Sequence, residues 1–206
     1  MQKILLTSAG FTRKLAETFL EMLNKKAEEA KILFIPAAAS YRDDAREGIA
    51  VCAHELGQMG IKQEYIFAYN LDYLLSKGYE RTYSGYVSNV PRQFRLLEVK
   101  EVLEFDAIVV CGGYSEFLLK QINRTGFDEV LKEAVQQGVP YVGISAGSMV
   151  AAGNFASGLK LIENAVQVHC EAGTPCGEIT HDGIIELRNE QAILVDEGKK
   201  MVVGCL

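Results

Sequence analysis

The chain has 206 residues, enough to bury a substantial core, and we expect residues 1–206 to form a single domain. Hydrophobic residues make up 49% of the sequence and charged residues 23%, a composition typical of compact globular proteins and not of disordered ones. The net charge is −6 without a basic stripe, and no apolar run is long enough for a membrane span, so neither nucleic acid nor membrane is expected as a partner.

Short apolar runs recur along the chain, and helical patterns with one apolar stripe separate them. The predicted strands are residues 3–8, 31–36, 62–67, 105–111 and 141–144. The predicted helices are residues 12–29, 43–59, 94–103, 114–122 and 127–137. Since the runs are apolar throughout and do not alternate, they indicate parallel strands covered on both faces. The strand–helix–strand order predicts an α/β fold, with three α/β/α layers around a mostly parallel, doubly wound sheet.

Two segments depart from this pattern. Residues 184–187, 191–195 and 200–204 are short β runs, which predict a C-terminal antiparallel meander at the sheet edge; such an edge could support a homodimer. Residues 70–93 contain four tyrosines among glycine and serine without a clear period. We interpret this segment as a surface loop or hairpin, with a lid over a substrate as the alternative.

The most informative stretch is Gly143-Ile-Ser-Ala-Gly147, at the end of the predicted strand 141–144. A strand that breaks at G-x-S-x-G and continues as a helix is typical of a nucleophile elbow, whose serine occupies a turn too tight for flanking side chains. The amides that follow Ser145 would face an oxyanion formed beside it. The alternative is a closely packed strand-to-helix turn without chemistry.

Ligands of open α/β sheets collect at the carboxyl ends of the strands. Three loops of unusual composition are expected there, at residues 37–40, 112–115 and 143–148. The pair Gly112-Gly113 can bring bare N–H groups close to a ligand, as an oxyanion hole requires, although it could also be a plain helix-entry turn. Arg42 and Arg46 follow the first loop and could receive a substrate carboxylate or simply be solvated.

A serine needs a base to act as a nucleophile at neutral pH, and histidine is the usual one. His54 lies within a predicted helix and His181 in a polar loop. His169 ends a β-like run that starts at Ala165, which places it on the side of Ser145 if that strand is parallel. A histidine that follows the serine in chain order is usual in elbow hydrolases, so we expect His169 to be the base.

The cysteines and the N-terminal residues indicate where the protein is located in the cell and whether a metal is expected. No signal peptide is visible, and the odd number of cysteines then predicts reduced thiols and a cytoplasmic protein. Cys170, Cys176 and His181 lie near His169, but their spacing does not match the paired pattern of structural zinc sites. Neither a metal nor another cofactor is expected.

Several motifs, in order along nearly the whole chain, resemble the peptidase E (dipeptidase E) family of serine peptidases. This family is related to cyanophycinase within the class I glutamine amidotransferase-like group. The motifs are Phe34-Ile-Pro-Ala-Ala38, Ile108-Val-Val-Cys-Gly-Gly113 with Phe117-Leu-Leu119, Gly143-Ile-Ser-Ala-Gly-Ser148, Gly158-Leu-Lys-Leu-Ile162 leading to His169, and Gln191-Ala-Ile-Leu-Val195 through Val203-Gly204. The ordered set is more specific than any one motif.

The resemblance implies a three-layer α/β/α fold and hydrolysis of short peptides, often with an acidic residue at the amino terminus. It implies that Ser145 is the nucleophile and His169 the general base, and that the amides of Gly113 and Ala146 form the oxyanion hole. The amidotransferase relatives carry cysteine at the elbow, so Ser145 favours the peptidase branch.

The sequence departs from the family pattern around the base. Tyr114 stands where the family usually has asparagine, and the neighbours of His169 differ from the usual proline and aromatic residue. The stretch that carries the family's triad aspartate is missing. Glu163 stands at a position that the family fills with proline, so it is not given that role, and Glu171 and Asp182 are possible substitutes without a motif. Two hypotheses follow: a serine hydrolase acting on peptides, and a non-catalytic or altered member that binds a small ligand in the same cleft.

Overall fold

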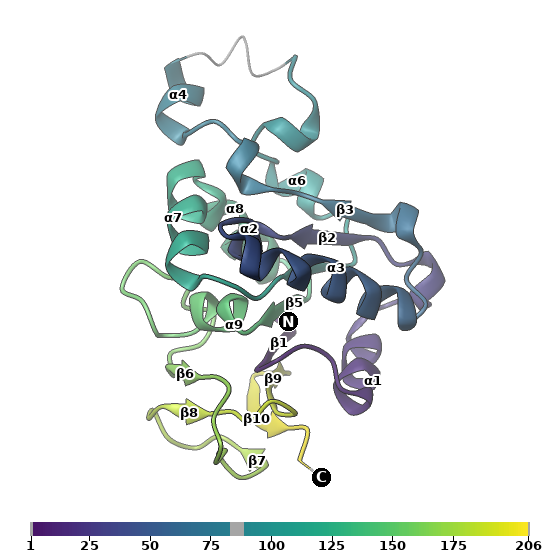
Figure 1. Cartoon of the computed structure of the whole chain (residues 1–206), viewed down its shortest axis with the longest axis vertical. Helices are drawn as coiled ribbons and strands as arrows, with labels where there is room; N and C mark the ends of the chain where they lie inside the picture. The colour runs from purple at the N-terminus through teal and green to yellow at the C-terminus, as the bar shows by residue number, and fades with distance from the viewer. Residues whose placement is uncertain (1, 83–88, 206) are drawn as a thin grey trace.

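A computed structural model describes residues 2–82 and 89–205 and contains a large and a small sheet (Figure 1). Within these residues the large sheet has eight strands in the order β3-β2-β4-β5-β1-β9-β10-β7. These strands are β1 (Ile4–Thr7), β2 (Ile32–Ile35), β3 (Ile66–Ala68), β4 (Ala107–Val110), β5 (Tyr141–Ile144), β7 (Gly177–Glu178), β9 (Ala192–Asp196) and β10 (Lys199–Val203). The first five strands in sheet order are parallel, and the other three continue the sheet antiparallel. The predicted mostly parallel α/β sheet is confirmed.

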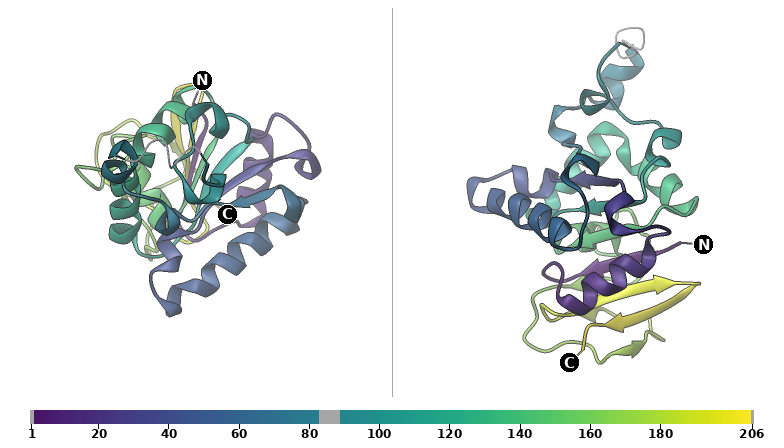
Figure 2. Two further views of the ribbon diagram at one scale, coloured as in Figure 1. Left: turned by 90° about the horizontal axis from the view of Figure 1, so that it is seen from above. Right: turned by 90° about the vertical axis from the view of Figure 1, so that its right-hand side faces the viewer.

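Helices connect the strands and cover both faces of the sheet (Figure 2). The α-helices in the described residues are α1 (Arg13–Met22), α2 (Ala37–Ser40), α3 (Asp43–Gln58), α4 (Lys77–Thr82), α6 (Val99–Val102), α7 (Ser115–Thr125), α8 (Phe127–Gln136) and α9 (Ala146–Ala151). The 3-10 turns there are η1 (Ala27–Glu29), η2 (Gln63–Tyr65), η3 (Leu71–Tyr73) and η4 (Arg92–Phe94). None of these helices combines the length and the apolar character needed to cross a membrane.

Successive residues of the central strands face opposite apolar clusters, which explains why the strand sequences are apolar throughout. Leu5 packs into the cluster beneath α1 and α3, and Leu6 into the cluster beneath α7, α8 and α9. Both side chains are fully buried, and burying one leucine contributes about 1.5–3 kcal/mol. The sheet therefore lies between two helical layers, and its carboxyl edge is left to carry polar groups.

Several predicted bounds differ in the structure. α1 ends at Met22 because Leu23 is already extended, whereas the prediction continued the helix to residue 29. The predicted loop at residues 37–40 is the helical turn α2, whose three alanines are fully buried. The predicted strand at 62–67 begins as η2, so only β3 remains, and the predicted helix at 94–103 is reduced to α6. Each difference lies where a short 3-10 or helical turn connects two elements.

The C-terminal meander is only partly as predicted. β9 and β10 are antiparallel neighbours, and β9 pairs with β1. The run at 184–187 does not join them, because its strand β8 (Ile185–Glu186) pairs in parallel with β6 (Val166–Gln167) in the small sheet. The strand beside β10 is instead β7, whose two residues are exposed and carry no apolar pattern that would predict a strand.

β7 also brings Cys176 to the end of the chain, where it forms a disulfide with Cys205. The prediction of reduced thiols was wrong for this pair, because the pairing of β7 with β10 places cysteines 29 positions apart side by side. Cys52, Cys111 and Cys170 are free thiols. The disulfide closes the C-terminal segment on itself.

The tyrosine-rich segment lies at the end of the molecule opposite β7 (Figures 1 and 2). Its described parts include η3 and α4, and Arg124 of α7 anchors η3 by donating to the carbonyl oxygens of Leu71 at 3.0 Å and Leu74 at 2.9 Å. Tyr83 and Tyr86 lie outside the described residues.

Candidate active site

Ser145 occupies the abrupt turn between β5 and α9 at the carboxyl edge of the sheet. Its backbone has φ 47° and ψ −102°, a conformation that costs a non-glycine residue about 1–3 kcal/mol. A Cβ on Gly143 would lie 2.6 Å from the carbonyl carbon of Gly147, and a Cβ on Gly147 would lie 2.5 Å from the carbonyl oxygen of Val110. Both flanking positions therefore require glycine, as the G-x-S-x-G spacing predicts.

Buried hydrogen bonds fix this turn against β1. The Ser145 N–H donates to the Thr7 carbonyl oxygen at 3.0 Å, and the hydroxyl of the fully buried Ser148 lies 2.7 Å from the same oxygen. The Tyr141 hydroxyl donates to the Gly147 carbonyl oxygen at 2.9 Å. Complete burial raises the pKa of Tyr141, so the phenol remains a neutral donor. Ser145 is thus held by backbone contacts that leave its own hydroxyl for other partners.

His169 approaches Ser145 from the C-terminal part of the chain. Its Nε2 atom lies 3.0 Å from Ser145 Oγ, which is hydrogen-bonding distance. Its backbone has φ 58°, and its N–H donates to Ser8 Oγ at 2.7 Å. Ser8 is fully buried and donates in turn to the Leu187 carbonyl oxygen at 3.2 Å. The strand before His169 belongs to the small sheet, so the loop after β1, and not the main sheet, sets the position of the imidazole.

Asn189 completes the arrangement, and no sequence prediction included it. Its Oδ1 atom lies 2.8 Å from His169 Nδ1. Because an amide oxygen can only accept a hydrogen bond, Nδ1 carries the proton and the lone pair of Nε2 faces Ser145 Oγ. Asn189 lies in the turn between β8 and β9. Asparagine is common in turns for local backbone reasons, so its presence there does not by itself indicate a role in the site.

Gln191 fixes the turn that carries Asn189. Its side chain is buried; its Oε1 atom accepts from the Arg188 N–H at 2.9 Å, and its Nε2 atom donates to the Thr174 carbonyl oxygen at 2.8 Å. The same Nε2 atom lies 3.1 Å from Cys205 Sγ. The Gln191 side chain therefore connects the disulfide to the turn that orients the imidazole.

The acids near His169 in the sequence do not hydrogen-bond to it in the described structure, where both ring nitrogens are used by Ser145 and Asn189. These acids, all exposed, are Glu163, Glu171 and Asp182. The third group of the arrangement is thus a neutral amide.

The glycine pair after β4 lies against Ser145. A Cβ on Gly112 would come within 3.3 Å of Ser145 Cβ. Gly113 has φ 136°, and a side chain there would collide with the Ala38 carbonyl group. Within the described part of the chain the Gly113 N–H donates to no other protein group. Ala146 opens α9, so its N–H has no carbonyl partner one turn earlier in the helix.

Arg42 and Arg46 are engaged with acids of their own segment. Arg42 Nη2 lies 3.2 Å from Asp44 Oδ2, and Arg46 Nη1 lies 3.3 Å from Asp43 Oδ1. The Arg42 guanidinium also lies 5.2 Å from the centroid of the Tyr114 ring. The four charged side chains are largely exposed, so the two ion pairs are weak. The contacts favour the interpretation that both arginines are solvated.

A pocket of about 310 Å³ lies on the α3 side of the glycine pair and contains groups with shifted pKa values. Burial raises the pKa of Glu55. A hydrogen bond between the Cys52 and Cys111 thiols raises the pKa of Cys52 and lowers that of Cys111. These groups line the inner side of the glycine loop.

The other two histidines do not join Ser145. His54 lies on α3, and His181 accepts the Gly183 N–H on its Nδ1 atom at 3.0 Å. Cys176, considered with His181 as a metal ligand, is held in the disulfide. Across residues 2–82 and 89–205, no three His, Cys, Asp or Glu side chains gather closely enough to hold a metal ion.

Comparison with known proteins places the chain in a family. The family model "Peptidase family S51" matches residues 87–203, which is more than half of the chain. The chain belongs to peptidase family S51. This assignment confirms the resemblance to peptidase E that the ordered motifs indicate.

Relatives of this S51 chain match it over short segments. A peptidase E from Streptomyces coelicolor is 51% identical over 49 residues, which are 24% of this chain and 20% of that protein. An uncharacterised peptidase from Pasteurella multocida is 41% identical over 50 residues, 24% of each chain. The chain thus matches less than a quarter of the length of either relative.

Solved structures agree in fold over the whole chain. A peptidase E-like protein from Listeria monocytogenes has a TM-score of 0.70 at 19% identity, with both chains covered completely. A peptidase from an acI-B1 actinobacterium has a TM-score of 0.63 at 18% identity, with 100% of this chain and 88% of that chain covered. At such identities the likeness shows a shared fold.

The close packing at the turn yields a first prediction. Gly143→Ala should lower the free energy of unfolding by about 1–3 kcal/mol, because the new methyl group meets backbone atoms that cannot move aside. Gly57→Ala in α3 is the matched control: a Cβ there meets nothing within 4 Å, so it should stabilise the protein by about 0.5–1 kcal/mol. Denaturant unfolding of both variants measures the difference, and equal stabilities would contradict the packing described.

Proposed function

We propose that this S51 protein is a serine peptidase that hydrolyses short peptides, with Ser145 as nucleophile and His169 as general base. The observation that carries the proposal is the chain of hydrogen bonds from Ser145 Oγ to His169 Nε2 at 3.0 Å and from His169 Nδ1 to Asn189 Oδ1 at 2.8 Å. A nucleophile, a base and a group that orients the base are what acyl transfer by a serine requires.

The reaction follows from this order of groups. As Ser145 Oγ bonds to the peptide carbonyl carbon, its proton passes to His169 Nε2, and the carbonyl oxygen becomes an oxyanion. The N–H groups of Gly113 and Ala146 stabilise that oxyanion. The imidazolium then gives its proton to the leaving amine as the C–N bond breaks. Water, deprotonated by the same imidazole, attacks the acyl-enzyme and releases Ser145.

Asn189 takes the place of the usual carboxylate. Its Oδ1 atom selects the Nδ1–H tautomer and the ring orientation, as the asparagine does in Cys-His-Asn peptidases. It carries no charge, so it stabilises the imidazolium less than an aspartate would. Asn189 is therefore a positioning residue, and we expect a slower enzyme than one with a complete Ser-His-Asp triad.

The strained serine favours catalysis over the alternative of a non-catalytic ligand-binding protein. A backbone at φ 47° and ψ −102° persists only where the surroundings impose it. In a nucleophile elbow this strain exposes the serine beside a helix N-terminus, whereas a plain binding cleft gains nothing from it. The cytoplasmic location and the homodimer through the sheet edge stay predictions.

The nucleophile can be tested directly. We expect a fluorophosphonate probe to label the wild-type protein and not Ser145→Ala, because the Ser145 hydroxyl faces an imidazole that can accept its proton. Ser157→Ala, which removes an exposed hydroxyl, serves as the control and should label normally. Turnover of short peptides should fall by a factor on the order of 10⁴–10⁶ in Ser145→Ala. Equal labelling of Ser145→Ala and wild type would exclude the proposed nucleophile.

The role of Asn189, the neutral partner of the base, can be tested separately. Asn189→Ala should lower kcat/KM by about 10²-fold, since the imidazole loses its orientation. Asn189→Asp should raise kcat and move the acid limb of the pH–rate profile to higher pH, because a carboxylate stabilises the imidazolium. Asn24→Ala replaces an exposed residue outside the site, so it should leave kcat/KM and the pH–rate profile unchanged. Pre-steady-state and pH-dependent kinetics measure these effects, and identical profiles for all three variants would show that Asn189 has no such role.

A further inference from the structure

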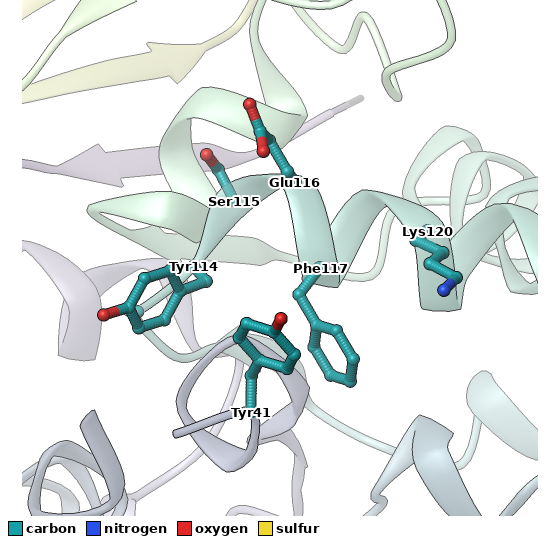
Figure 3. Close-up of a pocket in the computed structure, with 7 residues that line it drawn as sticks. Tyr41, Tyr114, Ser115, Glu116, Phe117 and Lys120 are labelled. Carbon is teal, nitrogen blue, oxygen red and sulfur yellow. The ribbon is translucent and has the colours of Figure 1, made fainter. Parts of the chain in front are cut away.

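Three aromatic rings surround an open space next to the glycine pair, and we call them the aromatic shelf: Tyr41, Tyr114 and Phe117 (Figure 3). The Tyr41 and Phe117 rings are stacked, with centroids 4.5 Å apart and an interplanar angle of 23°. Tyr114 meets Tyr41 edge-on at 5.6 Å. Tyr41 is 54% exposed, so part of a large ring faces solvent beside the site.

The pocket at this shelf has a volume of about 380 Å³ and includes Gly113 in its lining. Gly113 follows Gly112, whose missing side chain would touch Ser145. The pocket therefore begins one residue away from the glycine that packs against Ser145. Its volume is at the lower end of the range typical of small-molecule sites, which suits a single amino-acid side chain better than a long peptide.

The sheet order decides which part of the peptide reaches the shelf. Ser145 follows β5, which lies between β4 and β1. His169 is held by Ser8, which follows β1, and by Asn189, which precedes β9, so it approaches Ser145 from the side of these two strands. The shelf is built after β2 and β4, on the other side. Because the imidazolium must protonate the leaving amine, that amine lies on the His169 side and the acyl residue on the side of the shelf.

From this arrangement we propose that the aromatic shelf binds the side chain of the residue whose carbonyl is attacked, and that it selects an aromatic or large apolar residue there over an acidic one. The proposal rests on the proposed function of Ser145 and His169. Stacking on the exposed rings supplies the attraction, since aromatic pairs gain energy beyond the area they bury.

The charges around the shelf agree with this preference. Its rim carries one acidic and one basic side chain, Glu116 and Lys120, so the rim has no net charge. The nearby Arg42 lies over the Tyr114 ring and is paired with Asp44. An acidic side chain placed against the ring faces would lose hydration without gaining a hydrogen bond from those faces.

The test compares two phosphonate probes that differ only in the acyl-side group, a benzyl group or a carboxymethyl group. Each reacts when Ser145 Oγ bonds to phosphorus and phenoxide leaves with a proton, so the labelling rate reports binding at the shelf without peptide turnover. The benzyl probe should label wild type faster than the carboxymethyl probe. Tyr41→Ala and Phe117→Ala should each lower the benzyl-to-carboxymethyl rate ratio on the order of tenfold, the scale of a lost apolar pocket contact.

Tyr73→Ala is the matched control, because Tyr73 is also exposed but packs near Phe94 and does not line the pocket. It should leave the ratio unchanged, and thermal unfolding of all three variants shows that they fold. Faster labelling by the carboxymethyl probe, or a ratio that Tyr41→Ala and Phe117→Ala leave unchanged, would overturn the shelf assignment while Ser145 remains the nucleophile. If neither probe labels Ser145, the proposed function fails and the shelf assignment fails with it.

Discussion

The site depends on the close packing of Gly143 on Gly147. With no side chain between the end of β5 and the start of α9, the chain turns within one residue and leaves Ser145 at φ 47°. The same packing presses the first turn of α9 onto β1, where the Ser148 hydroxyl meets the Thr7 carbonyl oxygen. A strained residue persists only when its neighbours over-determine it. Here the neighbours are two buried strands, so the strain at Ser145 is supported by the core of the sheet.

The base is positioned by different means. His169 lies on a turn outside the main sheet, and its backbone N–H donates to the buried Ser8 hydroxyl. Asn189 reaches the other ring nitrogen from a turn that Gln191 fixes. Gln191 in turn contacts the sulfur of Cys205, within the disulfide. The serine thus depends on the parallel core, and the orientation of its base depends on the small sheet and the C-terminal segment.

The sequence predicts the serine side of the site well and the base side poorly, and the difference has a physical cause. The bounds of β5 and the need for Gly143 and Gly147 follow from local sterics and from a continuous apolar run, which can be read in a single stretch of chain. His169 could be anticipated from its residue type and chain order. The role of Asn189 arises only when two distant turns meet, and an asparagine in a turn has an ordinary local explanation. β7 and its disulfide were missed for the same reason, since a two-residue exposed strand exists only through its partner.

The most direct measurement of the central claim is the protonation of the His169 ring in solution. Long-range proton–nitrogen NMR correlations of protein labelled with nitrogen-15 in histidine distinguish the two neutral tautomers, and His169→Gln assigns the signals. The structure predicts that neutral His169 carries its proton on Nδ1, donated to Asn189 Oδ1, with Nε2 free to accept the proton of Ser145. Loss of this preference in Asn189→Ala would show that the amide imposes it. A neutral His169 protonated on Nε2 in the wild-type protein would contradict the account.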